Sequence, residues 1–357
     1  MSIAAYVAKR VLVSVVLLVA LTFLTFWLYQ LTPIDPARVV IGAGPAVIPQ
    51  QMRDQIDHAL GTDRPLVTQY VDWVDGVVHG DLGIAWQGAT VDPDGGAFGT
   101  SVVSEIVPAT WRSLSVVAGG LALLLLFVVP IAAVSAARPG SWFDRTTAAL
   151  LLIGISTHPL VVGLILQSFQ RRWGWLPQNG YCPMRGSGGG ATLPDGSTCH
   201  GLASWASHLV MPWFTFAVFF AALYVRVLRA TLLEVLDEPF VSTARAKGAS
   251  EPRVLLRHAL RNAFRPILTM TGMEAGMAVT VLLYIEVVFG IGGLGRLSLD
   301  GFSGDLGYDR PVILALVLFL GIGIIGLNLL VDLLYPVIDP RVTAGAERRR
   351  LLVGPAA

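Results

Sequence analysis

Long apolar runs dominate the pattern of the chain. Six of them are long enough to cross the hydrocarbon core of a bilayer, which takes roughly 20 apolar residues. They lie at about Val11–Leu31, Ser113–Ala137, Thr146–Phe169, Leu209–Leu228, Ile267–Phe289 and Val312–Tyr335. A segment in lipid has no water to bond its backbone, so each run is predicted to be helical. The pattern predicts an all-α integral membrane protein with about six transmembrane helices.

The first run follows Lys9 and Arg10, as the apolar part of a signal peptide would. It is longer than a typical signal core, and no small-residue cleavage site follows it. We therefore expect it to be retained as a helix.

Basic residues alternate between the loops in a way that predicts the orientation. Four segments carry them: the start of the chain, the link between runs two and three, the link between runs four and five, and the tail. Their basic residues include Lys9, Arg10, Arg138, Arg145, Arg229, Arg245, Lys247, Arg253, Arg257, Arg261, Arg265, Arg341, Arg348, Arg349 and Arg350. With six helices all four segments lie on one side, and short basic loops stay in the cytoplasm. Both termini are predicted to be cytoplasmic.

The composition is that expected of a membrane protein, and it argues against a soluble domain and a general nucleic-acid binder. Of the 357 residues 54% are hydrophobic and 14% charged, and the mean hydropathy is +0.67. A soluble domain carries about 25% charged residues. The net charge of +1 argues against a general nucleic-acid binder.

The chain is predicted to have four parts. Residues 1–31 form the N-terminal transmembrane helix, and 32–112 form a large outward loop. Residues 113–340 form a five-helix core that contains a cytoplasmic loop at 229–266, and 341–357 form a cytoplasmic tail.

The outward loop is expected to have structure of its own. Val47–Leu60 and Pro65–Val78 show helical periodicity, with Tyr70, Trp73 and Val74 on one face of the second segment. The sequence Gly80-Asp-Leu-Gly83 then predicts a turn. We interpret this loop as a capping subdomain rather than as a catalytic one.

Both cysteines, Cys182 and Cys199, fall in the predicted outward loop between runs three and four. They flank the Gly-rich stretch Arg185–Ala191, and an oxidising compartment favours a disulfide between them. A metal site is the competing interpretation, but His200 and His208 would complete only a thin ligand set.

The cytoplasmic loop between runs four and five is the most informative stretch. Phe240–Lys247 is predicted to be a helix that Gly248 stops in the left-handed conformation. Ser250 is a candidate N-cap of a second helix that has Pro252 in its first turn and runs to about Phe264. Taken alone, the loop could also be a basic segment held near anionic lipid headgroups.

The sequence of this loop resembles a known motif. Thr243-Ala-Arg-Ala-Lys-Gly248, then Leu256–Ala263 and Pro266, resembles the EAA loop of binding-protein-dependent ABC importer permeases, closest to the peptide and nickel branch. The resemblance covers nearly the whole chain and points to the B-type subunit. Its other parts are Leu60–Pro65 with Gln69, Tyr70 and Trp73, Gly80–Gly83, Glu286 with Phe289 and Gly293–Gly295, and Asn328, Asp332, Tyr335 and Asp339–Arg341.

The resemblance implies a transport subunit without its own ATPase site. Partners would be a second homologous permease, two ATPase subunits that bind ATP and Mg, and an outer substrate-binding protein. A phosphate loop needs Gly-Lys-Ser/Thr, whereas Lys9 precedes Arg10 and Lys247 precedes Gly248. The residues implied to contact the ATPase are Phe240, Thr243, Ala244, Arg245, Ala246, Lys247, Gly248 and Ala249.

Three polar residues within the runs are candidates for the translocation path. An ionised Glu286 side chain would be costly in lipid. In one interpretation it meets the peptide's amino terminus, and in the favoured one it pairs with a basic group such as Arg296. Asn328 and Asp332 are four apart, hence on one helix face, and packing between helices is the favoured role. His158-Pro159 predicts a kink in run three; a Ser156–His158 protease pair is disfavoured because the two point in different directions.

These observations predict an ABC importer permease for di- or oligopeptides in a bacterial cytoplasmic membrane. The alternative is a secondary transporter or channel for small polar solutes, and an intramembrane enzyme is a third. No metal or cofactor is expected in the chain itself.

Overall fold

The computed structural model describes residues 3–32, 34–42, 47–92, 96–177, 179–184, 199, 201–302 and 308–338. The fold divides into two compact units. Unit 1 comprises Met1–Ser115 and Gly290–Gly323, and unit 2 comprises Val116–Phe289 and Ile324–Ala357. Helices α5 (Val102–Ala137) and α15 (Arg310–Ile338) each contribute to both units. The prediction of a helical membrane protein is confirmed.

Four continuous helical segments are long and apolar enough to cross a membrane: Ala8–Leu31, Val102–Ala137, Gly201–Leu236 and Arg310–Asp332. Two further candidates are bent pairs of helices, Trp142–Gly154 with Pro159–Trp173 and Arg265–Met273 with Ala275–Phe289. If each pair is one span, the described residues contain six, as the apolar runs predict.

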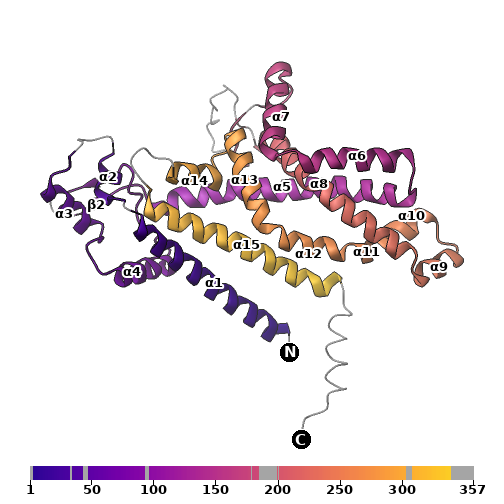
Figure 1. Ribbon diagram of the computed structural model, residues 1–357, viewed down its shortest axis with the longest axis horizontal. Helices are drawn as coiled ribbons and strands as arrows, with labels where there is room; N and C mark the ends of the chain where they lie inside the picture. The colour runs from indigo at the N-terminus through magenta and orange to yellow at the C-terminus, as the bar shows by residue number, and fades with distance from the viewer. Residues whose placement is uncertain are drawn as a thin grey trace, which may run out of the picture. The chain divides into compact units, whose positions relative to one another are not determined.

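The third run bends by 102° between α6 (Trp142–Ser156) and α7 (Pro159–Trp173), a sharp turn visible in Figure 1. The bend lies at His158-Pro159, where a kink is predicted. His158 caps α7, because its Nδ1 accepts the backbone N–H of Leu160 at 3.3 Å. The Ser156 hydroxyl donates to the carbonyl of Leu152 at 3.0 Å, so it is occupied within its own helix.

The fifth run is not one helix, which corrects the expectation. It bends by 63° between α12 (Arg265–Met273) and α13 (Ala275–Phe289), at Glu274. Glycines at 272 and 276 flank the break, and glycine is a recognised cause of sharp kinks. A Cβ on Gly272 would lie 2.8 Å from Asn328 Oδ1, so the Asn328 side chain on α15 lies close to the backbone of α12 at this glycine.

Unit 1 contains helices that the apolar pattern predicts and elements that it does not. Besides α1 (Ile3–Leu31), the helices α3 (Gln50–Ala59) and α4 (Leu66–His79) confirm the two segments expected in the outward loop. The unpredicted elements are α2 (Pro36–Ile41), the hairpin of β1 (Thr90–Val91) with β2 (Ala97–Phe98), and α14 (Leu294–Phe302). They are too short for periodicity to reveal.

Tyr70 holds α4 against α1 and α15 within unit 1. It packs in one apolar cluster with Phe26 and Leu314, and Trp73 and Val74 lie against this cluster. Its hydroxyl donates to the Val19 carbonyl at 3.0 Å. The predicted aromatic face of α4 is therefore the face that packs.

The turn predicted at Gly80–Gly83 is present. Gly80 ends α4 in the left-handed conformation, with φ +81°, and Gly83 has φ +84°. Asp81 Oδ1 accepts the backbone N–H of Gly83 at 2.9 Å and closes the turn.

Unit 2 is organised around α8 (Gly201–Leu236), which contacts α6, α7, α12, α13 and the segment that follows α9. Small residues let α5 approach α8 closely. A Cβ on Gly119 would lie 2.0 Å from the Trp213 ring, and one on Gly120 would lie 2.8 Å from Phe216. Such contacts replace the hydrophobic driving force that lipid does not supply.

Cys182 and Cys199, separated by 17 positions in the sequence, form a disulfide. Both are buried, and the sulfur of Cys182 lies 3.8 Å from Nε2 of His208. The disulfide is therefore the interpretation that the structure supports over a metal site.

Several predicted features lie outside the described residues. They are the Gly-rich stretch Arg185–Ala191, His200, Asp339–Arg341 and the tail 341–357; the side chain of Tyr335 is also outside them.

We expect Gly119→Ala to lower the free energy of unfolding by about 1–3 kcal/mol, because the added methyl overpacks against Trp213. Gly326→Ala, inside α15, is the matched control, since its Cβ meets nothing within 4 Å. Thermal unfolding of the purified variants in detergent would compare them; equal stability would contradict the close contact of α5 with α8.

Non-reduced protein treated with a thiol-alkylating reagent is expected to show neither Cys182 nor Cys199 modified, because the two sulfurs are bonded. After reduction both should be alkylated. Peptide mass spectrometry distinguishes the states, and free alkylation of both cysteines before reduction would refute the pairing.

Candidate functional site

Within the predicted loop at 229–266, the residues between α8 and α12 form a compact helical hairpin, which we call the coupling loop (residues 237–264). Helix α9 (Pro239–Ala246) starts after a turn at Asp237 and Glu238, and Pro239 occupies its first position. Proline suits that position because its missing N–H would have no partner there. The predicted first helix is confirmed, one residue displaced at each end.

Helix α9 ends in a Schellman motif built on Gly248. The N–H of Gly248 donates to the Arg245 carbonyl at 2.9 Å, and the N–H of Ala249 donates to the Ala244 carbonyl at 3.1 Å. Gly248 has φ +82°, the left-handed conformation predicted for it. No atom lies within 4 Å of an added Cβ, so the glycine is required by backbone conformation and not by space.

One face of α9 is anchored and the other is open. Val241 is fully buried, and α9 contacts the π-helical segment η1 (Val254–Ala259). Ala244 and Ala249 are half-buried. The remaining predicted contact residues are exposed: Phe240, Thr243, Arg245, Ala246, Lys247 and Gly248. The exposed face thus carries an aromatic ring, two cations and little bulk between them.

An ion pair closes the hairpin. Arg245 Nε lies 2.8 Å from Glu251 Oε1, and its Nη2 lies 3.2 Å from Oε2. This two-point geometry fixes the direction of the guanidinium, although exposed pairs contribute little stability.

The second predicted helix is present but is not uniform. It consists of α10 (Glu251–Arg253), the π-turn η1 and α11 (Leu260–Ala263). Ser250 is the N-cap residue, as predicted, although its side chain makes no capping hydrogen bond. The π-turn was not predicted, because propensity does not distinguish i→i+5 bonding from α-helix.

The coupling loop is tied to the helices on both sides of it. α8 runs directly into it, α12 begins at Arg265 just after it, and α11, α12 and η1 all pack on α8. At the base of the loop, Arg229 Nε and Nη2 lie 2.6 and 2.8 Å from the two oxygens of Asp144 on α6. Sequence reasoning missed Asp144 as a partner, since nothing in the sequence shows which acid meets Arg229.

The three predicted path residues lie on other elements. Glu286, on α13, is fully buried. Arg296 donates to Asp300 at 3.2 Å within α14, and its pairing with Glu286 stays a prediction. Asn328 and Asp332 lie on α15, where the Asn328 amide donates to the Ile324 carbonyl at 3.1 Å. Their roles in a path stay predictions.

Glu274 is an acidic residue inside the fifth apolar run that the sequence pattern did not identify as a candidate. It lies at the bend between α12 and α13 and borders a cavity of about 20 Å³ with Tyr224 and Thr271. The signal was available, because an ionisable residue inside a predicted span is costly and marks function by default.

Among the described residues no group of three or more His, Cys, Asp or Glu side chains is placed to hold a metal ion. The docking role of the exposed α9 residues stays a prediction.

Comparison with known proteins defines the family. Residues 128–344 match the family described as binding-protein-dependent transport system inner membrane component, and residues 3–107 match its N-terminal membrane component. The first match alone covers more than half of the chain. The chain belongs to this family.

Members of the family cover the chain almost end to end. A protein of Brucella suis biovar 1 (strain 1330), named as a peptide permease, is 35% identical over 94% of this chain and 98% of its own length. The glutathione transport system permease protein GsiC of Escherichia coli O6:H1 is 31% identical over the same shares. A solved chain of the MetNI methionine ABC transporter covers 66% of this chain and 97% of its own, with 18% identity and a TM-score of 0.48.

Membership of the family makes the chain an inner-membrane component of a transport system. The prediction of a bacterial membrane permease subunit, separate from the ATPase, is thereby confirmed. The coupling loop lies wholly within the first matched region.

Proposed function

We propose that this chain forms half of the membrane pathway of an ABC importer for short peptides, with α9 as the element that receives movement from an ATPase subunit. The observation that carries the coupling role is the anchored, exposed α9 with its Schellman cap. A second permease, two ATPase subunits with ATP and Mg, and an outer substrate-binding protein would complete the assembly.

The geometry of α9 suits docking in a groove. Its exposed face presents Phe240 beside small residues, so another backbone can approach closely. Buried apolar anchors surrounded by small or neutral contacts are typical of binding hot spots. Because α8 and α12 pack on the same hairpin, a displacement of α9 bears on two membrane helices together.

Peptide cargo rests on the relatives. The 35% identical relative is named as a peptide permease, and the 31% identical one as a glutathione permease. Glutathione is itself a modified tripeptide, so both names describe small substrates with amide bonds and free carboxylates. A di- or oligopeptide of a few residues is the cargo we propose.

Gly248→Val tests the coupling role. A β-branched residue at a left-handed φ costs about 1–2 kcal/mol, and here no clash adds to it. If α9 docks as proposed, peptide uptake should fall roughly tenfold or more, since 1.4 kcal/mol is tenfold in an equilibrium. Uptake of labelled dipeptide and ATP hydrolysis would be measured on reconstituted complex of equal abundance.

Two variants serve as controls for that experiment. Gly248→Asn should retain most uptake, because asparagine tolerates the left-handed conformation. Gly174→Val places the same strain on the C-cap of α7, where φ is +64° and the added Cβ again meets nothing. Normal uptake by a well-expressed Gly248→Val complex would show that the loop is only a basic surface segment.

The isolated subunit should turn over no nucleotide, because its two lysines lie outside any phosphate-loop sequence. ATP-driven uptake should require a second permease and two ATPases in the same vesicle. Phosphate release by the purified subunit alone, resistant to removal of contaminating ATPases, would refute this assignment.

A further inference from the structure

Unit 1 contains a cavity of about 430 Å³ that the transport role does not explain. Its walls come from α4, the Leu60–Pro65 turn, the segment after Gly80, and the start of α15. Gln69, Trp73, Trp86 and Arg310 line it.

Arg310 is a buried cation, with only 8% of its surface exposed. Its guanidinium carbon lies 4.7 Å from the ring centre of Trp86 and 5.3 Å from that of Phe26. Nη1 donates to Gln69 Oε1 at 2.8 Å. Among the described residues no carboxylate forms an ion pair with Arg310, and the side chain that accepts its hydrogen bond, Gln69, is neutral.

The neighbouring acid, Asp309, has other partners. Its Oδ2 accepts the backbone N–H of Gln87 at 2.8 Å, and its Oδ1 accepts that of Val312 at 3.4 Å. Burial raises the pKa of Asp309, which further weakens it as a counter-ion for Arg310.

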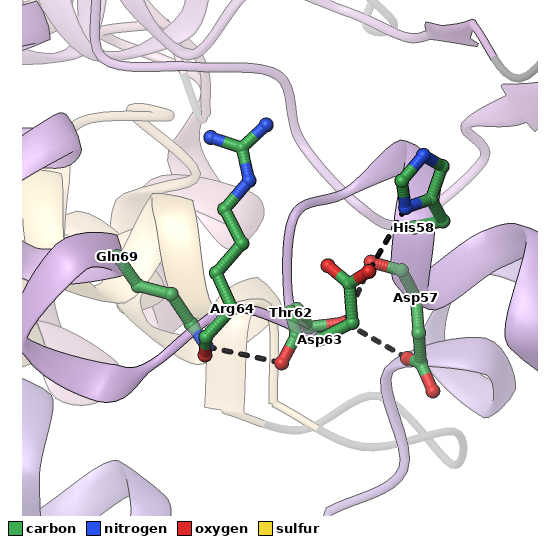
Figure 2. Close-up of polar contacts among 6 residues, drawn as sticks. All are labelled: Asp57, His58, Thr62, Asp63, Arg64 and Gln69. Carbon is green, nitrogen blue, oxygen red and sulfur yellow. Dashed lines mark hydrogen bonds and ion pairs between the residues drawn. The ribbon is translucent and has the colours of Figure 1, made fainter.

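Gln69 fixes where the guanidinium points. Its Nε2 donates to the carbonyls of Thr62 at 3.0 Å and Arg64 at 2.7 Å. Figure 2 shows Gln69 with these residues of the turn. Both amide donors are thus occupied, and Oε1 must face Arg310. The turn is itself held by Thr62 Oγ1 on Asp57 Oδ1 at 2.8 Å and by His58 Nδ1 against Asp63 Oδ2 at 2.9 Å.

Trp73, another residue of the cavity wall, carries a donor without an acceptor. Trp73 Nε1 is buried and makes no hydrogen bond. The other acids of the wall have partners: Asp72 Oδ2 pairs with Arg64 Nη1 at 3.1 Å, and Asp81 Oδ1 accepts the N–H of Gly83.

We propose that this cavity is a receptor for a carboxylate group, bound by the Arg310 guanidinium with the indole N–H of Trp73 as a further donor. A buried charge is costly unless an opposite charge meets it, and a guanidinium fork matches a carboxylate at two points. The aromatic rings and Gln69 hold the guanidinium in place before the ligand arrives, so little ordering is needed on binding.

Two sources of that carboxylate fit the chemistry. One is the C-terminus of a short peptide, and the other is an acidic side chain of an outer partner protein. Both sources rest on the proposed function. Binding is measured without ATP, so a failed titration and a failure of ATP-driven uptake are distinguishable.

The test is calorimetric titration of the intact purified complex with three probes. N-acetyl-alanyl-alanine carries a terminal carboxylate, its C-terminal amide carries none, and N-acetyl-glutamate amide carries only a side-chain carboxylate. Binding of the first alone assigns the site to a peptide C-terminus. Binding of the third, with or without the first, assigns it to a side-chain carboxylate.

Arg310→Gln should weaken carboxylate binding about tenfold or more, and Trp73→Phe about threefold to tenfold, since it removes one neutral donor and keeps the ring. Arg53→Gln is the matched control, because it removes a guanidinium that pairs with Asp35 away from the cavity. If Arg310→Gln does not fold, the carboxylate affinity of Trp73→Phe tests the proposal. No carboxylate binding beyond the amide, or equal binding by wild type and Trp73→Phe, would overturn the proposal.

Discussion

The structure depends on one constraint, that a backbone in lipid must bond its own N–H and C=O groups. Helices meet it throughout the apolar runs, and the two bent runs show how a break meets it too. At the first break His158 accepts an N–H of α7, and Pro159 has no N–H to leave unpaired. At the second, the N–H of Glu274 donates to the Met270 carbonyl, while the Glu274 carbonyl accepts from Ala278. Helices can therefore change direction without exposing unpaired groups.

Backbone groups at a helix end are also hydrogen-bonded in the coupling loop, outside the apolar runs. Gly248 and Ala249 satisfy the last carbonyls of α9, and Val241 buries the inner face. The exposed face is the one that the proposed function assigns to a partner. In the proposed function, the contacts of this hairpin with α8 and α12 would carry a movement of α9 to two membrane helices, because packed helices move as bodies.

In unit 1 a polar network lies beside the apolar clusters. Gln69 links the Leu60–Pro65 turn to the start of α15 by three hydrogen bonds. Buried networks of this kind are stable only when each member is satisfied. The two members without a matching partner, the Arg310 charge and the Trp73 N–H, lie together at one cavity.

The apolar runs by themselves determined the fold class, because the thickness of a bilayer sets the length of each helix. Two local features were also predicted from sequence. Gly248 predicted the end of α9, and His158-Pro159 predicted a break in the third apolar run. Only the tertiary structure decided that Glu274 stands at a second bend, that Asp144 meets Arg229, and that Gln69, Trp73 and Arg310 share a cavity. Those contacts join residues far apart in the chain, and a one-dimensional pattern carries no distance between them.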